Sequence, residues 1–300
     1  MKYKKLIKRL KNAEIILMDG AMGTEILNRG VPTTLPLWSA EALLTHPEVV
    51  QQIYEDYIKA GAEIIITNTF ATTKRTFAKK EIGEKASEAT ILACKLAQQA
   101  RNAVKVSHDV YIAGSVAPLE DCYSPELTPS QKELEKEHYE IVRDLKDGGV
   151  DFILIETMIT LRETLAALAA AKVFDLPVAV SFCCNDKYQL LGGELLDEVI
   201  PVIEKFNPLF IGVNCVSIPI ATKIIHYLRT ITSFPLSVYA QGDGEPENDQ
   251  GWKFRHQETE KIYLKAAKQW LKDGAQIIGG CCGTTPGYIK KLKKVIKNNE

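Results

Sequence analysis

A helix end, a glycine and an apolar strand follow one another in Lys59-Ala60-Gly61-Ala62-Glu63-Ile64-Ile65-Ile66-Thr67. The same order recurs at Lys146-Asp147-Gly148-Gly149, before the apolar run 150–155, and at Lys272-Asp273-Gly274-Ala275, before the run 276–280. Glycine accepts the left-handed conformation that ends many helices. A strand that is apolar at nearly every position is typical of a parallel sheet covered on both faces. The pattern therefore predicts strands that alternate with helices.

Five further apolar segments are spaced along the chain in the same way, and with the three above they bring the number of predicted strands to eight. Helices are predicted between the strands, where apolar residues recur at helical spacing. Thr45 and Glu48 predict a capping box at the start of one helix, with Pro47 in its first turn. The five strands are predicted at residues 15–18, 110–113, 178–182, 209–213 and 236–239, and the clearest helices at 49–57, 160–174 and 195–206.

Eight strands that alternate with helices over 300 residues predict the α/β class and a (β/α)8 TIM barrel. A doubly wound open sheet is the alternative, and its dinucleotide-binding form is disfavoured because no G-x-G-x-x-G sequence follows the first strand. No Pro- or Ser-rich linker divides the chain, so we expect one domain over residues 1–300, with a core at about 14–290. The polar stretch 242–251 is predicted to be a mobile loop over the site.

The composition is that of a globular protein, with 46% hydrophobic residues, 25% charged residues and a net charge of -1. A charge this near zero argues against a nucleic-acid partner, which usually leaves a basic footprint. The basic segment 1–11 carries Leu6, Ile7 and Leu10 at helical spacing, so we interpret it as a surface helix rather than a membrane or nucleic-acid arm. We find no membrane-spanning run and no signal peptide, and therefore expect a cytoplasmic protein without a membrane partner.

Active sites of such barrels lie where the strands end, and three cysteines occupy that position. Cys215 follows the predicted sixth strand, and Cys281 and Cys282 follow the eighth. Three thiolates suit zinc, and a catalytic zinc site keeps one position open for substrate, although buried apolar cysteines are the alternative. Cys183 and Cys184, after the fifth strand, are interpreted as core or as support for the site. An odd count of seven cysteines without a secretion signal argues against a disulfide framework.

Two carboxylates end buried strands at the same predicted edge. Asp19 follows the first strand and Glu156 ends the fourth. Buried acids need partners or stay neutral, so a substrate ammonium would serve both, and a structural hydrogen bond to a loop is the alternative. The segment 20–24 opens the next helix, and its free amides could hold a carboxylate, although a tight turn would explain it equally. Together these parts predict a site for a thiol amino acid.

Several segments resemble those of a known family. Asp19-Gly20-Ala21-Met22-Gly23-Thr24, Gly212-Val213-Asn214-Cys215 and Gly279-Gly280-Cys281-Cys282-Gly283-Thr284-Thr285-Pro286 resemble the signature motifs of the homocysteine S-methyltransferase family. Leu37-Trp38-Ser39-Ala40, Thr67-Asn68-Thr69-Phe70 and Ile155-Glu156-Thr157 are similar to further family segments. The resemblance covers most of the chain, and it implies the barrel fold.

The resemblance also implies a ligand set. Cys215, Cys281 and Cys282 are expected to bind Zn²⁺, with the homocysteine sulfur completing the shell. Where many relatives have an Asn that can touch the metal, this chain has Gln241, so Gln241 or water is the expected fourth ligand at rest. The amino-acid end of homocysteine is expected at Glu156 and the Asp19 loop, and the full set assigned to substrate binding is Asp19, Gly20, Ala21, Met22, Asn68, Ser115 and Glu156.

The expected reaction is methyl transfer to homocysteine, which gives methionine. The thiolate of homocysteine, held on zinc, would attack an activated methyl group in line. S-methylmethionine or S-adenosylmethionine is the expected donor, because the segment around Trp38 resembles that branch and Trp38 could face a sulfonium through cation–π attraction. The alternatives are a module that takes methyl from a separate corrinoid protein or methylfolate, betaine as donor, and a zinc-holding thiol sensor without catalysis.

Overall fold

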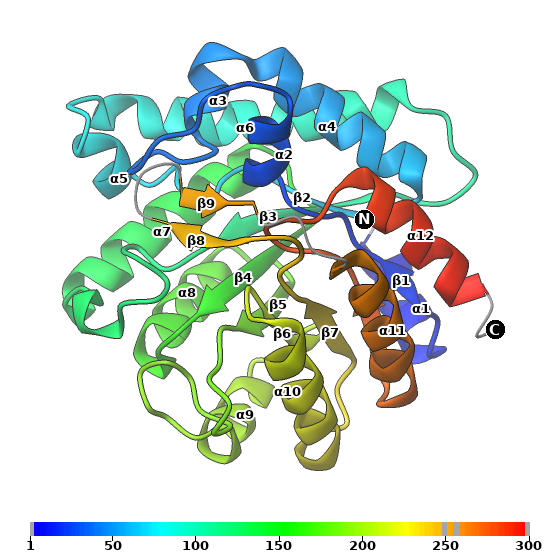
Figure 1. The fold of residues 1–300 in the computed structure, drawn as a ribbon. Coiled ribbons are helices and arrows are strands. Elements are labelled where there is room, and N and C mark those ends of the chain that lie inside the picture. The colour runs from blue at the N-terminus through cyan, green and yellow to red at the C-terminus, as the bar shows by residue number, and fades with distance from the viewer. Residues whose placement is uncertain (1–2, 248–250, 255–258, 298–300) are drawn as a thin grey trace.

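The chain forms a barrel of eight parallel strands inside a ring of helices (Figure 1). The computed structural model describes residues 3–247, 251–254 and 259–297. All eight predicted strands are present, and the predicted (β/α)8 barrel is confirmed. The strands are β1 (Ile16–Leu17), β2 (Ile64–Ile66), β3 (Tyr111–Val116), β4 (Phe152–Met158), β5 (Val178–Phe182), β6 (Ile211–Asn214), β7 (Leu236–Tyr239) and β10 (Ala275–Ile278).

Hydrogen bonds run in the order β1-β10-β7-β6-β5-β4-β3-β2, and each neighbouring pair is parallel. Met18 also forms a parallel bridge with Ile64, and the Asp19 N–H donates to the Ile64 carbonyl at 2.9 Å. This contact joins β1 to β2 and closes the sheet. A closed parallel sheet brings every strand's C-terminal end to one rim, which is where active sites of such barrels lie.

The helices surround the sheet, and glycines end several of them as predicted. Gly61, Gly149 and Gly274 have positive φ values of 115°, 76° and 91°, which residues with a Cβ rarely adopt. The helices are α1 (Tyr3–Lys11), α2 (Gly23–Asn28), α3 (Glu41–Thr45), α4 (Pro47–Ala60), α5 (Lys74–Ala78), α6 (Ala86–Ala103), α7 (Gln131–Asp147), α8 (Leu161–Val173), α9 (Leu196–Glu204), α10 (Ile218–Ile231), α11 (Thr259–Lys272) and α12 (Pro286–Lys297), with 3₁₀ turns η1 (Gly83–Lys85) and η2 (Pro125–Leu127).

Two apolar cores follow from the alternation of side chains along the strands. One fills the barrel interior, and it includes Ile16, Met18 and Ile64. The other lies between the strands and the helices. The predicted surface helix is α1, whose Leu6 and Leu10 belong to the interior core, so this helix covers the N-terminal end of the barrel. Within the described residues, no helix is both long enough and apolar enough to cross a membrane.

Two local predictions are wrong. Thr45 does not cap α4, because it is the last residue of α3 and its hydroxyl donates to the Glu41 carbonyl at 3.0 Å. His46 precedes α4 instead, and Pro47 opens that helix as predicted. The stretch 242–251 is not simply a loop, since the antiparallel strands β8 (Glu245–Glu247) and β9 (Gly251–Lys253) pair there. Residues 248–250 of that stretch lie outside the described residues, so its predicted mobility stays a prediction.

Candidate active site

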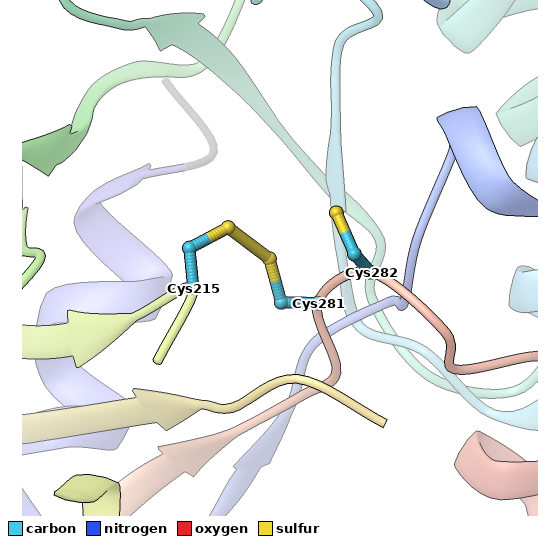
Figure 2. A group of neighbouring side chains, drawn as sticks. All are labelled: Cys215, Cys281 and Cys282. Atoms are coloured by element: carbon cyan, nitrogen blue, oxygen red, sulfur yellow. A yellow bond between two sulfur atoms is a disulfide. The ribbon is translucent and has the colours of Figure 1, made fainter. Parts of the chain in front are cut away.

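Three cysteine sulfurs meet at the C-terminal rim of the barrel. Cys215 directly follows β6, whereas Cys281 and Cys282 lie in the loop between β10 and α12. Their Sγ atoms all lie within 4.8 Å of one another. Figure 2 shows Cys215 and Cys281 joined as a disulfide, with the Cys282 side chain beside them. The odd cysteine count argued against a disulfide framework. The structure nevertheless has one disulfide, between Cys215 and Cys281, because two thiols that converge on one point are near enough to bond when oxidised.

The loop that carries Cys281 and Cys282 is tightly held. The Cys281 N–H donates to the Ala240 carbonyl at 2.9 Å, and the Cys281 carbonyl accepts from the Thr284 hydroxyl at 2.7 Å. Gly283 has a φ of 79°, so the turn needs glycine at that position. Burial raises the pKa of the Cys282 thiol to about 12, so without a metal this thiol is protonated at neutral pH.

Two buried carboxylates lie on the same rim. Glu156, 6% exposed, accepts from the Ser115 hydroxyl at 2.6 Å and the Tyr239 hydroxyl at 3.0 Å. Asp19, 2% exposed, accepts from the Ile66 N–H through Oδ2 at 2.8 Å, while its Oδ1 has no hydrogen-bond partner. Burial raises the pKa of both carboxyls, and the charge of Glu156 raises that of Asp19 further. A bound cation would offset this cost and satisfy the free oxygen.

The backbone connects the acids to the cysteines. Tyr239, whose hydroxyl contacts Glu156, accepts the Cys215 N–H through its carbonyl at 3.3 Å. The Gly280 N–H donates to the Asp19 carbonyl at 2.9 Å, one residue before Cys281. The carboxylates and the sulfurs therefore belong to one site. Such a site can hold a cation at the acids and a soft ligand or metal at the thiols.

Comparison with known proteins decides the family. A family model described as homocysteine S-methyltransferase matches residues 16–296. The chain belongs to the homocysteine S-methyltransferase family. It is 31% identical to the homocysteine S-methyltransferase of Escherichia coli strain K12, over 95% of this chain and 96% of that one. It is 28% identical to homocysteine S-methyltransferase YbgG of Bacillus subtilis strain 168, over 93% of each chain.

Solved structures agree with this family. The metallated form of the homocysteine methyltransferase MmuM from Escherichia coli matches with a TM-score of 0.83 and 28% identity, covering 95% of this chain and 97% of that chain. The oxidized form of the same protein matches with a TM-score of 0.85 and 28% identity, covering 96% of this chain and 99% of that chain. The likeness therefore extends over the whole barrel.

In this family member, two further predicted substrate-binding positions, Ala21 and Asn68, also have protein partners. The Ala21 N–H donates to the Thr284 hydroxyl at 3.2 Å, and α2 begins only at Gly23, after Met22. The Asn68 side chain accepts from the Ser39 hydroxyl at 2.6 Å and donates to the Ser39 carbonyl at 2.9 Å. One oxygen of Asn68 and one amide of the 20–22 segment are thus used in fixing the rim.

Sequence reasoning missed three residues that shape this family member's site. Tyr239 fixes Glu156, and it could have been found because it ends a predicted strand. Thr284 bonds to both the Asp19 loop and the cysteine loop, through Ala21 and Cys281. Tyr123, whose hydroxyl contacts the Cys215 carbonyl, lies in the long connection after β3. No periodic pattern marks such a residue, so its contact with Cys215 could not be predicted from the sequence.

Trp38, the residue considered for donor binding, lies between two elements. Its half-buried indole packs against Gly23, at the start of α2, and against Gly251, at the start of β9. A Cβ at either glycine would overlap the ring. Trp38 therefore ties the β8–β9 hairpin to the helix that follows the Asp19 loop.

Proposed function

We propose that this protein is a homocysteine S-methyltransferase that holds Zn²⁺ at Cys215, Cys281 and Cys282 and binds the homocysteine ammonium at Asp19 and Glu156. The proposal rests above all on the three sulfurs within 4.8 Å of one another, beside two buried carboxylates. We also propose that residues 1–300 form one homocysteine-binding domain.

The donor set fits zinc. Zn–S bonds are about 2.3 Å long, so sulfurs this close can share one ion after small movements. Cys215 and Cys281 must be reduced first, because a disulfide offers no thiolate. Three protein ligands leave a fourth position for the substrate sulfur, which is the arrangement of a catalytic rather than a structural zinc site. When bound, Zn²⁺ would lower the pKa of the homocysteine thiol so that it is a thiolate at neutral pH.

The protein's own groups would orient the substrate. Asp19 Oδ1 is buried without a partner and could accept from the ammonium, and Glu156 is held in place by Ser115 and Tyr239. With the amino-acid end fixed there, the substrate sulfur would be presented to the donor methyl group. The sulfur then forms a bond to the methyl carbon as the donor's own bond to that carbon breaks, and the electron pair of the broken bond stays on the donor.

A sulfonium compound, S-methylmethionine or S-adenosylmethionine, is the donor we propose. Trp38 supports this choice, because its indole lies beside the helix that follows the Asp19 loop and an aromatic face attracts a sulfonium cation. On loss of the methyl group such a donor becomes a neutral thioether, which no longer gains from that attraction. This difference would favour release of the product.

The test is a donor screen on reduced, zinc-loaded protein with homocysteine. Homocysteine would carry an isotopically labelled carbon chain and would be mixed in turn with S-methylmethionine, S-adenosylmethionine, betaine and methyltetrahydrofolate, and methionine with the labelled chain would be detected by mass spectrometry. We expect methyl transfer from a sulfonium donor. Transfer only from methylfolate, or only after a methylated corrinoid protein is added, would contradict the proposed donor. No transfer from any donor while zinc is bound would indicate a sensor instead.

A further inference from the structure

Three side chains from three parts of the chain converge on one backbone oxygen. The Cys215 carbonyl accepts from the Gln241 amide at 3.1 Å, from the Tyr123 hydroxyl at 3.3 Å and from the Cys183 thiol at 3.8 Å. Cys215 is buried, so its carbonyl needs a protein partner, but a carbonyl oxygen has only two lone pairs and three donors exceed that need. Their convergence on the first residue after β6 therefore needs an explanation.

The hydrogen bonds among Tyr123, Gln241 and Cys215 can all form at once, because each proton has its own acceptor. The Tyr123 hydroxyl has one proton, which it gives to the Cys215 carbonyl, and its oxygen accepts from the Gln241 amide at 3.0 Å. The Gln241 amide has two protons, one for the Tyr123 oxygen and one for the Cys215 carbonyl. Tyr123 and Gln241 thus brace each other as well as Cys215.

Cys215 has a backbone conformation that needs such support. Its φ of 52° lies in the left-handed region, which is unfavourable for a residue with a Cβ and persists where the surroundings hold it. The Cys215 N–H is fixed by the Tyr239 carbonyl at 3.3 Å, and the Cys215 carbonyl by the three donors. With both ends of the residue held, the direction of its Cα–Cβ bond is set, and its sulfur is limited to the χ1 rotamers about that bond.

The segment that carries Tyr123 is itself anchored. The Leu119 N–H donates to the buried Glu163 carboxylate at 2.8 Å. Glu120 pairs with Arg75 at 3.2 Å and with Lys79 at 2.6 Å. The Tyr123 hydroxyl is therefore presented by a fixed segment rather than by a free side chain that happens to reach the cysteine.

We propose that Tyr123 is a positioning residue of the metal site, which acts with Gln241 to hold Cys215 in the left-handed conformation that directs its sulfur toward Cys281 and Cys282. This inference rests on the proposed function, since it concerns the cysteines taken there as zinc ligands. In this proposal the Gln241 side-chain amide holds the backbone carbonyl of the ligand residue Cys215. Groups that orient a metal ligand commonly change metal affinity when they are removed.

The test is the Zn²⁺ affinity of Tyr123→Phe, measured on reduced protein by competition with a chelator of known affinity. This change removes only a hydroxyl, and Tyr123 is 38% exposed, so we expect the variant to fold and to keep its Tm. We expect its Zn²⁺ affinity to fall about 10-fold. The absorption spectrum of the Co²⁺ form should also change, because it reports the arrangement of the sulfurs and not overall stability.

Tyr139→Phe is the matched control. Tyr139 is an exposed tyrosine of α7 that packs on Phe174, at the opposite end of α8 from the rim. Its variant should match the wild type in both readings. Gln241→Leu, which removes two hydrogen bonds, should lose at least as much affinity as Tyr123→Phe.

Two outcomes would overturn the inference in distinguishable ways. If the wild type binds Zn²⁺ and Tyr123→Phe binds it equally well with the same Co²⁺ spectrum, the inference fails and the proposed function stands. If the reduced wild type binds no Zn²⁺, the proposed function fails and takes the inference with it.

Discussion

Burial of the Glu156 side chain lowers the free energy of unfolding at neutral pH. It is 6% exposed, and burial raises its pKa from the usual 4.5, although Ser115 and Tyr239 donate to it. The folded protein therefore binds this proton more tightly than the unfolded chain does. As pH rises above 4.5 toward the raised folded value, the unfolded state gives up the proton first, so the free energy of unfolding falls. A group kept at such a cost is typical of a binding site.

Glu156→Gln should accordingly stabilise the protein without substrate at neutral pH. Below the unfolded pKa both forms are neutral and the gain should be small, and it should grow as pH rises through the folded pKa. We expect an increase in Tm of about 2 °C, measured by calorimetry from about pH 4 to about pH 8. Glu135→Gln, an exposed position on α7, should show no such trend. A Tm difference that shrinks with rising pH would contradict the account.

The same substitution should separate substrate binding from metal binding. Glu156→Gln removes a charge that would face the homocysteine ammonium, so homocysteine affinity should fall about 10-fold or more, because a hydrogen bond to a charged group is worth about 1.5–3 kcal/mol. Zn²⁺ content should be unchanged, since Glu156 is not among the proposed ligands. Titration calorimetry and elemental analysis would measure the two. Equal loss of both would show that Glu156 supports the metal site instead.

At the scale of elements, the β8–β9 hairpin is tied to the rim through Trp38. Gly251→Ala should disturb this contact, because a Cβ there would overlap the indole and Gly251 has a φ of 78°. We expect the KM for the methyl donor to rise several-fold, with the KM for homocysteine nearly unchanged. Gly30→Ala is the control, since Gly30 has a φ of 77° but open space around its Cβ position. A donor KM that rises equally in both variants would mean that backbone strain alone is responsible.

Elements differed in how well the sequence predicted them. Buried strands were found, because a parallel strand covered on both faces is apolar along most of its length, as in β4 and β5. The capping box at Thr45 failed because two helices meet there, and the residue that ends one cannot cap the next. The β8–β9 pairing was missed because each strand has only three residues, too few to show a period, and β8 contains a proline and β9 a glycine.

At the scale of the whole molecule, the barrel explains both the success and the limit of sequence reasoning about the site. Strand order places every strand end on one rim, so Cys215 and Cys281, 66 residues apart, could be predicted to meet. Side-chain pairings across the rim depend on the conformations of loops, which no periodic pattern in the sequence predicts. The contact of Tyr123 with Cys215 and of Thr284 with Ala21 could therefore be seen only in the structure.

The proposed function requires that Cys215, Cys281 and Cys282 hold one zinc ion, and the metal content of the protein shows whether they do. Protein reduced and purified without oxygen, then incubated with Zn²⁺ and desalted, should retain one ion per chain by elemental analysis. Cys281→Ser should retain almost none, whereas Cys94→Ala, which removes a thiol buried in α6, should retain the wild-type amount. Wild-type protein that retains no zinc, or Cys281→Ser that retains a full equivalent, would contradict the account.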